Sequence, residues 1–295
     1  MGNPLRVGVI GVGAMGMAVA LRALDEGFAV AVRDIRPEAE AAAAAAGAKV
    51  CASPAEVGRA ADLVIVLVID RHQVDTVVFG ADGLVHGMAA GGIVVVSSTI
   101  EPDFAETIGP RLAPASLHHI DGPVSGGPAR ARDGTMSMMA ACPDAVFAQA
   151  EPTLRQLASR LFHVGRRTGD GACTKMLNNL LAGVNLAAAT EAIALGEKLG
   201  LDAVRLMEVI RASSGDSWMM GDRMPRALAG DFGVRATVAI LEKDLGIVTR
   251  AADAADYATP LADAALGVFA RTSAMGLGAA DDSALLKCYR AGQAG

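Results

Sequence analysis

The sequence has few of the features that build metal, disulfide, nucleic-acid or membrane sites. Its four cysteines stand at no zinc-binding spacing and its five histidines form no HExxH motif, so we predict neither a metal site nor a disulfide framework. No basic run is present and the net charge is -6, which argues against nucleic acid as a partner. The longest aliphatic run, residues 63–69, is far shorter than the roughly 20 residues that cross a bilayer. We therefore expect a cytoplasmic protein that does not associate with membranes.

The hydrophobic pattern predicts a two-domain α/β protein. With 52% hydrophobic and 20% charged residues, the 295-residue chain can bury a core. Short continuous apolar runs, typical of strands buried on both faces of a parallel sheet, alternate with helical segments up to residue 165. Beyond it the strand signals stop, and a long helix is predicted at 172–199. We predict a doubly wound Rossmann sheet in residues 1–165, followed by an all-helical domain in residues 166–295. The strands are predicted at 5–10, 28–32, 63–69, 93–96, 119–121 and 161–164, and the later helices at 203–212, 234–255 and 260–275.

A glycine-rich turn follows the first predicted strand. Gly11-Val12-Gly13-Ala14-Met15-Gly16 is a GxGxxG motif between a strand and a helix, the context in which a helix N-terminus binds a pyrophosphate. Asp34, at the end of the second strand, is placed to accept hydrogen bonds from a ribose hydroxyl, which favours NAD. Arg33 and Arg36 keep NADP as the less favoured alternative, because a guanidinium pairs with a 2′-phosphate. The other alternative is that the glycine-rich turn serves only close packing and binds no cofactor.

Two further segments carry groups suited to a substrate. The segment 121–128, Asp-Gly-Pro-Val-Ser-Gly-Gly-Pro, offers the Ser125 hydroxyl and the unhindered N–H groups of Gly126 and Gly127, which suit a carboxylate. A turn without a ligand explains this segment equally well. Lys175, one of only five lysines, opens an otherwise apolar helix, where desolvation would lower its pKa and favour proton transfer. Asn179 lies four residues later on the same helix face.

Alternatives also exist around Lys175. The lysine could simply extend from the first turn of a buried helix into solvent. Gly169 and Gly171, just upstream, are expected to leave room for a ligand.

The apolar stretch 175–190 has more apolar surface than a small helical domain usually needs. We expect it in the core or at a subunit interface, and we expect a homo-oligomer, either a dimer or a tetramer.

Four motifs, in order, resemble the β-hydroxyacid dehydrogenase family. They are GVGAMG at 11–16, DGPVSGG at 121–127, GDGACTKMLNN at 169–179 and KDL at 243–245. The resemblance implies an NAD(P)-dependent dehydrogenase acting on the CH–OH group of a small hydroxycarboxylic acid. It implies that the Ser125-Gly126-Gly127 turn holds the substrate carboxylate, that Lys175 is the general acid/base and that Asn179 orients substrate. It also implies that Lys243 lies by cofactor and substrate, and we count Thr99 with the cofactor-binding residues.

Within the family, the chain looks most like the L-threonate dehydrogenase branch, which acts on four-carbon acid sugars. The alternatives are 3-hydroxyisobutyrate dehydrogenase, tartronate semialdehyde reductase, a 3-hydroxy amino acid dehydrogenase, or a catalytically silent dinucleotide-binding module. A lysine at 175 speaks against the related imine reductases, which usually carry another residue there. The segments that carry the branch resemblance are 217–219, 223–224, 230–232 and 281–283.

Overall fold

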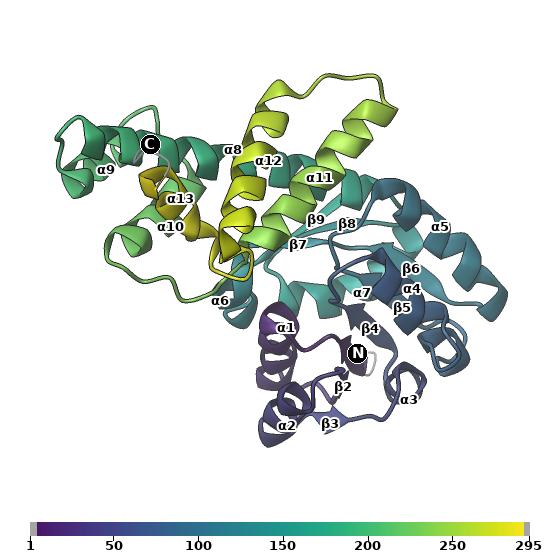
Figure 1. Ribbon diagram of the computed structural model, residues 1–295. Coiled ribbons are helices and arrows are strands. Elements are labelled where there is room, and N and C mark those ends of the chain that lie inside the picture. The colour runs from purple at the N-terminus through teal and green to yellow at the C-terminus, as the bar shows by residue number, and fades with distance from the viewer. Residues whose placement is uncertain (1–4, 292–295) are drawn as a thin grey trace. The chain divides into compact units, whose positions relative to one another are not determined.

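The computed structural model describes residues 5–291 and divides into two compact units (Figure 1). The first, here called the sheet unit, runs to Lys175, and the second, the helical unit, starts at Met176. This division falls inside a long helix, beyond the position 165 expected from the sequence. The outermost residues of the two predicted domains, 1–4 and 292–295, lie outside the described residues.

The sheet unit contains one sheet in the order β3-β2-β1-β4-β5-β6-β8-β7, with β9 paired to β8. From β3 to β6 every neighbouring pair is parallel. The order reverses between β1 and β4, which is where doubly wound sheets bind ligands beyond the carboxyl ends of their strands. The strands are β1 (Val7–Ile10), β2 (Val30–Arg33), β3 (Lys49–Val50), β4 (Leu63–Val66), β5 (Ile93–Val96), β6 (His118–Asp121), β7 (Val124–Ser125), β8 (Ser137–Ala141) and β9 (Arg160–Gly165).

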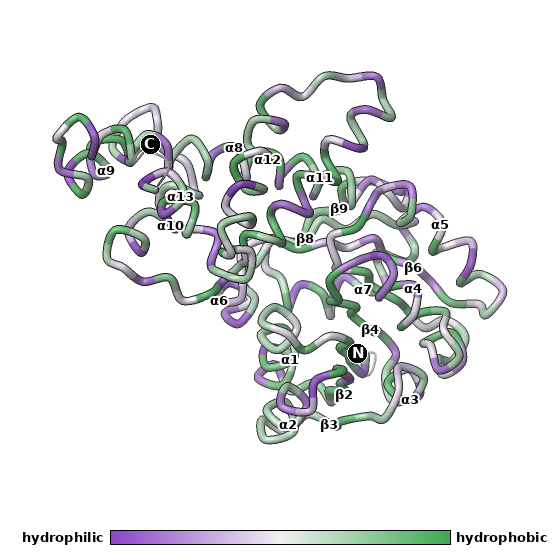
Figure 2. Tube along the Cα trace, viewed as in Figure 1, coloured by the Kyte–Doolittle hydropathy of each residue, from purple (hydrophilic) through white to green (hydrophobic). Residues whose placement is uncertain are grey.

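Helices cover both faces of this sheet. Alternate residues of β1, β4 and β5 enter two separate hydrophobic clusters, which explains why these strands read as continuous apolar runs. Figure 2 shows the apolar run of β4. Helices α1, α2, α6 and α7 contribute to one cluster, and α3, α4 and α5 to the other. The predicted Rossmann architecture is confirmed. These helices are α1 (Ala14–Asp25), α2 (Pro37–Ala45), α3 (Pro54–Ala60), α4 (Arg71–Phe79), α5 (Pro102–Leu112), α6 (Gly127–Arg132) and α7 (Asp144–Leu157), with short turns η1 (Leu84–His86) and η2 (Ala113–Ala115).

The β8 strand makes one edge of the sheet partly antiparallel. It runs antiparallel to β6 and β7 and parallel to β9. The sequence did not indicate this strand, because its Ser-Met-Met-Ala-Ala segment contains no β-branched or aromatic residue. Three of its residues, Met138, Ala140 and Ala141, are nevertheless fully buried, so packing rather than propensity determines the strand.

The helical unit is built on the long helix α8, as predicted. The helix runs from Asp170 to Lys198 and is long and apolar enough to cross a membrane by length and composition, but half of its most apolar window is buried inside the protein. Leu186 and Ile193 of α8 pack with Phe269 in one core. The other elements are α9 (Ala203–Arg211), α10 (Trp218–Leu228), α11 (Val238–Ala254), α12 (Pro260–Thr272), η3 (Ser273–Leu277), η4 (Asp282–Ala284) and α13 (Leu285–Ala291).

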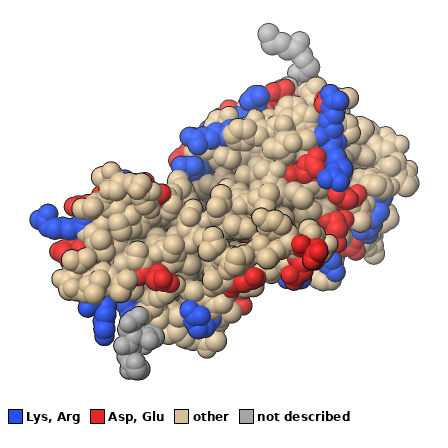
Figure 3. Space-filling view, turned by 90° about the horizontal axis from the view of Figure 1, so that it is seen from above, with Lys and Arg blue, Asp and Glu red and all other residues tan. Residues whose placement is uncertain are grey.

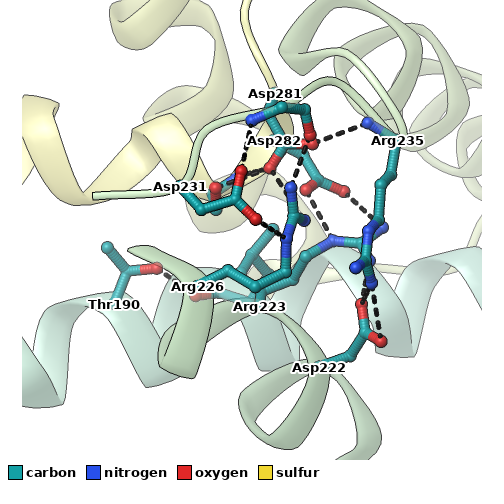
Figure 4. A network of polar contacts seen from close by, with 11 residues as sticks. Thr190, Asp222, Arg223, Arg226, Asp231, Arg235, Asp281 and Asp282 are labelled. Atoms are coloured by element: carbon teal, nitrogen blue, oxygen red, sulfur yellow. Dashed lines mark hydrogen bonds and ion pairs between the residues drawn. The ribbon is translucent and has the colours of Figure 1, made fainter. Parts of the chain in front are cut away.

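A network of ion pairs ties the last segment of the helical unit to α10 (Figure 4). The Arg223 guanidinium donates two hydrogen bonds to Asp282, from Nε at 2.6 Å and from Nη2 at 3.0 Å, and both side chains are buried. Asp282 lies 59 residues away along the chain, so this contact is tertiary. Asp281, fully buried beside it, accepts hydrogen bonds from the Arg235 amide at 2.8 Å and the Ser283 hydroxyl at 2.5 Å.

Candidate active site

The glycine-rich turn has the geometry of a dinucleotide-binding turn. A Cβ on Gly16 would lie 1.8 Å from the Gly11 carbonyl oxygen, so this position requires glycine for α1 to approach β1. Gly11 itself has φ +84°, which favours glycine. A Cβ on Gly13 would meet only the Arg36 Nη2 atom, at 3.6 Å. Space therefore remains open beside the Gly13 backbone at the start of α1, where a pyrophosphate fits.

Asp34 follows β2 and lies beside this turn with its carboxylate already paired. Its Oδ1 accepts hydrogen bonds from the Arg36 amide at 2.9 Å and from Arg36 Nε at 3.2 Å. Burial raises the pKa of Asp34, but the hydrogen bonds and charge of Arg36 outweigh it and lower the pKa. Arg33 is paired separately, with Glu40 Oε1 at 2.6 Å. Each of the two arginines is thus bound to a carboxylate of its own.

The carboxyl ends of the neighbouring strands meet at the same edge of the sheet. Thr99 follows β5 by three residues and is half-buried. Just before it, the buried Ser98 hydroxyl oxygen accepts a hydrogen bond from the Val68 amide at 3.0 Å, which connects the segments that follow β4 and β5. Because all these strands are parallel, their carboxyl ends also bring Thr99 to the edge that carries the glycine-rich turn.

The segment after β6 forms the second turn. Ser125 is half-buried and pairs with Ser137 across β7 and β8. Within residues 5–291 its hydroxyl has no hydrogen-bond partner. Gly126 and Gly127 have φ +128° and +74°, which non-glycine residues rarely adopt. The turn therefore presents a hydroxyl and tightly curved backbone, the arrangement expected for anion binding.

Lys175 lies in the second turn of α8 and is 92% buried, with 8% of its surface exposed. The start of this helix is held by Asp121, whose carboxylate accepts hydrogen bonds from the amides of Gly169 at 2.8 Å and Ala172 at 2.9 Å. Burial raises the pKa of Asp121 to about 6, and these backbone N–H groups oppose that rise.

The two glycines before Lys175 have a different role from the one expected. A Cβ on Gly171 would lie 2.5 Å from the Asp121 carbonyl oxygen and 2.7 Å from that of Met139. A Cβ on Gly169 would meet the Glu106 side chain at 2.7 Å, and Gly169 has φ +105°. The expectation that these glycines leave room for a ligand is wrong, because protein atoms occupy that space. Gly171 allows the start of α8 to pack against the sheet, and Gly169 allows the turn before α8 to pass close to α5.

In the helical unit, Asn179 and Lys243 share one partner. The Asn179 side-chain amide donates a 2.6 Å hydrogen bond to Asp244 Oδ2, and both groups are buried. Lys243 Nζ lies 2.9 Å from Asp244 Oδ1 in an ion pair that lacks hydrogen-bond geometry. Asp244 thus fixes the side chains of two residues singled out from the sequence.

Sequence reasoning missed two acidic residues of this arrangement, Asp121 and Asp244. Asp121 opens the DGPVSGG motif, and Asp244 follows Lys243 in the KDL motif. The available signal was composition: a carboxylate inside an apolar segment needs a partner. Which N–H groups would supply it depends on contacts 48 to 65 residues apart, which the sequence does not display.

The residues that suggested the L-threonate dehydrogenase branch are largely internal supports of the helical unit. Arg223 and Asp282 form the buried ion pair described above. Asp231 accepts a 3.0 Å hydrogen bond from Arg226 Nε, and the Ser217 hydroxyl oxygen accepts one from the Met220 amide at the start of α10.

Two other features bear on the kind of ligand. Within residues 5–291, no group of three or more His, Cys, Asp or Glu side chains is placed to hold a metal ion. On the face shown in Figure 3, Lys and Arg side chains lie among Asp and Glu side chains and form no continuous basic patch. A doubly wound sheet with this glycine turn has the architecture of a dinucleotide-binding domain.

Comparison with known proteins identifies the family. Residues 6–165 match the NAD-binding domain of 6-phosphogluconate dehydrogenase, and residues 169–289 match the NAD-binding domain of NADP-dependent 3-hydroxyisobutyrate dehydrogenase. The chain is 44% identical to an L-threonate dehydrogenase of Cupriavidus necator, covering 96% of this chain and 95% of the relative. The chain belongs to the β-hydroxyacid dehydrogenase family, in which it is most like the L-threonate dehydrogenase branch, and it is an enzyme of the NAD(P)-dependent dehydrogenase class.

Solved structures agree with this assignment. The crystal structure of a 3-hydroxyisobutyrate dehydrogenase from Salmonella typhimurium superposes with a TM-score of 0.90 at 38% identity, covering 97% of this chain and all of the other. A structure of Psf3 in complex with NADP+ and 2-OPP has a TM-score of 0.89 at 28% identity, covering 96% of this chain and 99% of the other.

Proposed function

We propose that the protein is an NAD-dependent dehydrogenase of an L-threonate-like four-carbon hydroxy acid, with Lys175 as general acid/base. One observation carries the chemical part of this proposal. Lys175 is a buried lysine on α8, and the next residue on its helix face, Asn179, has its amide fixed by Asp244 at 2.6 Å. A buried amine next to an oriented amide is suited to take a proton from a hydroxyl group.

The role proposed for each residue follows from its chemical group. Ser125, Gly126 and Gly127 bind the substrate carboxylate, Asn179 orients the hydroxyl, and Lys175 in its neutral form accepts the hydroxyl proton as the alcohol becomes a carbonyl. In the reverse direction Lys175, as an ammonium, returns the proton. NAD supplies the hydride acceptor. Gly11, Gly13, Ala14, Met15 and Gly16 hold its pyrophosphate, with Asp34, Thr99 and Lys243 completing its site.

For the cofactor, the pairing of Asp34 supports NAD over NADP. A 2′-phosphate would have to approach a buried carboxylate, and Arg36 and Arg33 are held by Asp34 and Glu40. We expect kcat/KM to be higher with NAD than with NADP, and Asp34→Ala to narrow that difference by releasing Arg36. The measurement is the initial rate with each cofactor. Equal rates in the parent protein would show that an arginine dominates.

We also propose that residues 1–165 bind the cofactor and that residues 166–295 serve substrate binding and dimerisation. The protein is proposed to be a cytoplasmic homo-oligomer. An apolar stripe on α8 supports self-association, since Leu177, Leu181 and Leu195 are each more than half exposed and lie at helical spacing. Light scattering should give a dimer or tetramer. A monomer mass would contradict this part of the proposal.

The central test is a panel of hydroxy acids assayed by the absorbance of reduced nicotinamide, together with Lys175→Ala. L-Threonate should be turned over faster than 3-hydroxyisobutyrate, glycerate and 3-hydroxy amino acids, and simple alcohols should fail because they lack the carboxylate. Lys175→Ala should lower kcat about 10² to 10⁴-fold and leave NAD affinity unchanged. Preference for 3-hydroxyisobutyrate would overturn the substrate, and full turnover by Lys175→Ala would overturn the mechanism.

A further inference from the structure

We propose that Asp121 is a positioning residue for Lys175: held in the sheet, it sets where the helix that carries the lysine begins. This inference rests on the proposed role of Lys175. It concerns residues of the sheet unit alone, which extends to Lys175. Three observations support it: the pairing of Asp121 with two neighbouring strands, the hydrogen bonds of its carboxylate, and the close packing of Gly171.

Asp121 is held on both sides by neighbouring strands. It pairs with Val96 of β5 in parallel register and with Ala141 of β8 in antiparallel register. The next amide, of Gly122, donates a 2.9 Å hydrogen bond to the Val96 carbonyl, and only 1% of Asp121 is exposed. Its side chain therefore starts from a backbone position that the sheet determines.

The carboxylate of Asp121 reaches from this fixed position to the first turn of α8. A single oxygen, Oδ2, accepts hydrogen bonds from the amides of both Gly169 and Ala172. Lys175 follows Ala172 by three residues, which is less than one helical turn. A buried anion at a helix N-terminus also interacts favourably with the helix dipole. Displacement of this turn would therefore displace the lysine with it.

The other charged groups at this helix start are paired with one another. Asp170 accepts hydrogen bonds from Arg167 at 3.0 and 3.2 Å, and Arg167 also lies 3.4 Å from Glu106. All three are more exposed than Asp121. They do not replace its contacts with the backbone amides, so Asp121 supplies the buried cap.

Gly171 constrains the same turn independently. The space of its missing Cβ is filled by the backbone carbonyls of Asp121 and Met139, at 2.5 and 2.7 Å. These are sheet atoms that cannot turn aside as a flexible side chain can. Any side chain at position 171 would therefore push the start of α8 away from the sheet.

One short segment thus serves both proposed substrate contacts. Asp121 fixes the helix of Lys175, while Ser125, four residues later, belongs to the turn proposed to hold the carboxylate. Both are paired with β8, through Ala141 and Ser137. The separation between the carboxylate-binding turn and the lysine is therefore set by β8 and by this cap, and a shift of about 1 Å in such a separation is enough to slow catalysis about 100-fold.

The test is a stopped-flow measurement of the first turnover with L-threonate and NAD, followed by NADH absorbance, in the full-length protein. The rate constant reports how well the reacting groups are placed, and the amplitude reports the fraction of working enzyme. We expect Asp121→Ala to lower the rate constant about 10- to 100-fold, with NAD affinity unchanged. Asp121→Asn, which keeps one acceptor oxygen, should fall between Asp121→Ala and the parent. Gly171→Ala should also lower the rate constant.

Matched controls separate positioning from stability. Asp202→Ala removes an exposed cap, which likewise accepts two backbone hydrogen bonds, from Val204 and Arg205 at the start of α9, and should leave the rate constant unchanged. Gly267→Ala places a Cβ in a helix with only Arg271 nearby, at 3.9 Å, and should also leave it unchanged. If Asp121→Asn and Gly171→Ala lower only the amplitude, Asp121 stabilises the fold without positioning the lysine and the inference is wrong. Full turnover by Lys175→Ala would overturn the proposed function as well, so the two failures are distinguishable.

Discussion

Asp121, a buried carboxylate of the sheet unit, and Asp282 and Asp244, two buried carboxylates of the helical unit, are held by different kinds of partner. In the sheet unit, Asp121 is bound by backbone amides of a neighbouring element. In the helical unit, Asp282 is bound by the guanidinium of Arg223, and Asp244 by the side chains of Asn179 and Lys243. Backbone amides are present whatever the residue, whereas side-chain partners must be retained together.

Because of this difference, the motifs of the two units give different information about function. In the sheet unit, the acid of DGPVSGG belongs to the framework of the proposed site, so fold and chemistry are found in one segment. In the helical unit, residues that mark the L-threonate dehydrogenase branch, such as Arg223 and Asp282, contact one another. Similarity at these positions therefore reports first on the internal packing of the helical unit, and only indirectly on substrate.

The largest expected effect comes from breaking the buried pair of the helical unit. Arg223→Ala leaves the Asp282 carboxylate buried without its guanidinium, which costs about 3–5 kcal/mol. Hydrogen exchange should quicken in α10 and α13 and stay slow in β4 and β5. The control is Arg6→Ala, which removes an exposed ion pair with Asp62 and should cost less than about 1 kcal/mol. Equal effects of the two variants would show that burial adds nothing to the contribution of the Arg223–Asp282 pair.

Replacing the pair as a whole should restore part of that loss. With Arg223→Met and Asp282→Leu combined, no unpaired charge is left in the core, and the double variant should be about 2–4 kcal/mol more stable than Arg223→Ala. Hydrogen exchange in α10 measures this directly. A double variant as unstable as Arg223→Ala would show that the geometry of the pair, rather than its charge, holds the C-terminal segment.

The smallest expected effect concerns a buried histidine in the sheet unit. Burial lowers the pKa of His119 to about 3, and its ring nitrogens have no hydrogen-bond partner within residues 5–291. The folded protein keeps this ring neutral while the unfolded chain, with a pKa near 6.5, takes up a proton, so stability is lost as pH falls from about 6.5 towards 3. His119→Leu should remove this loss.

The test compares urea unfolding of His119→Leu and the parent at about pH 7.5 and about pH 5. The advantage of the variant should grow by about 2 kcal/mol at the lower pH. Asp121 and Asp282, whose pKa values burial raises to about 6, have the opposite dependence, losing stability as pH rises from about 4 to 6. Both proteins contain them, so the difference isolates the histidine. If the stability difference between His119→Leu and the parent did not change with pH, His119 would not be a neutral ring that the folded protein keeps from being protonated.

The buried strands and the long helices could be predicted from the sequence because their patterns are strong. The run 93–96 coincides with β5, and the helix expected at 172–199 is α8 within two residues at its start and one at its end. Weaker patterns failed. The sequence indicated neither β8, whose methionines and alanines have low strand propensity, nor α10, in which Pro225 interrupts the helical pattern.

In the candidate site, too, some features could be predicted from the sequence and others could not. Gly11, Gly16 and the turn at Ser125 could be predicted, because local backbone geometry dictates their residue types. The cap by Asp121 and the contact between Asn179 and Asp244 could not, because they join segments far apart in the chain. Gly171 was misinterpreted for the same reason, since the atoms that exclude a side chain there come from two other strands.

The late position of Asp281 and Asp282 has a consequence for synthesis on the ribosome. The sheet unit has its whole chain by Lys175, and at 5–20 residues per second the chain from there to Asp282 takes about 5 to 21 s to be made. During that interval the sheet unit can fold, whereas Arg223 lacks its main partner until Asp282 emerges. The helical unit is thus the part that nascent-chain chaperones would meet in an unfinished state.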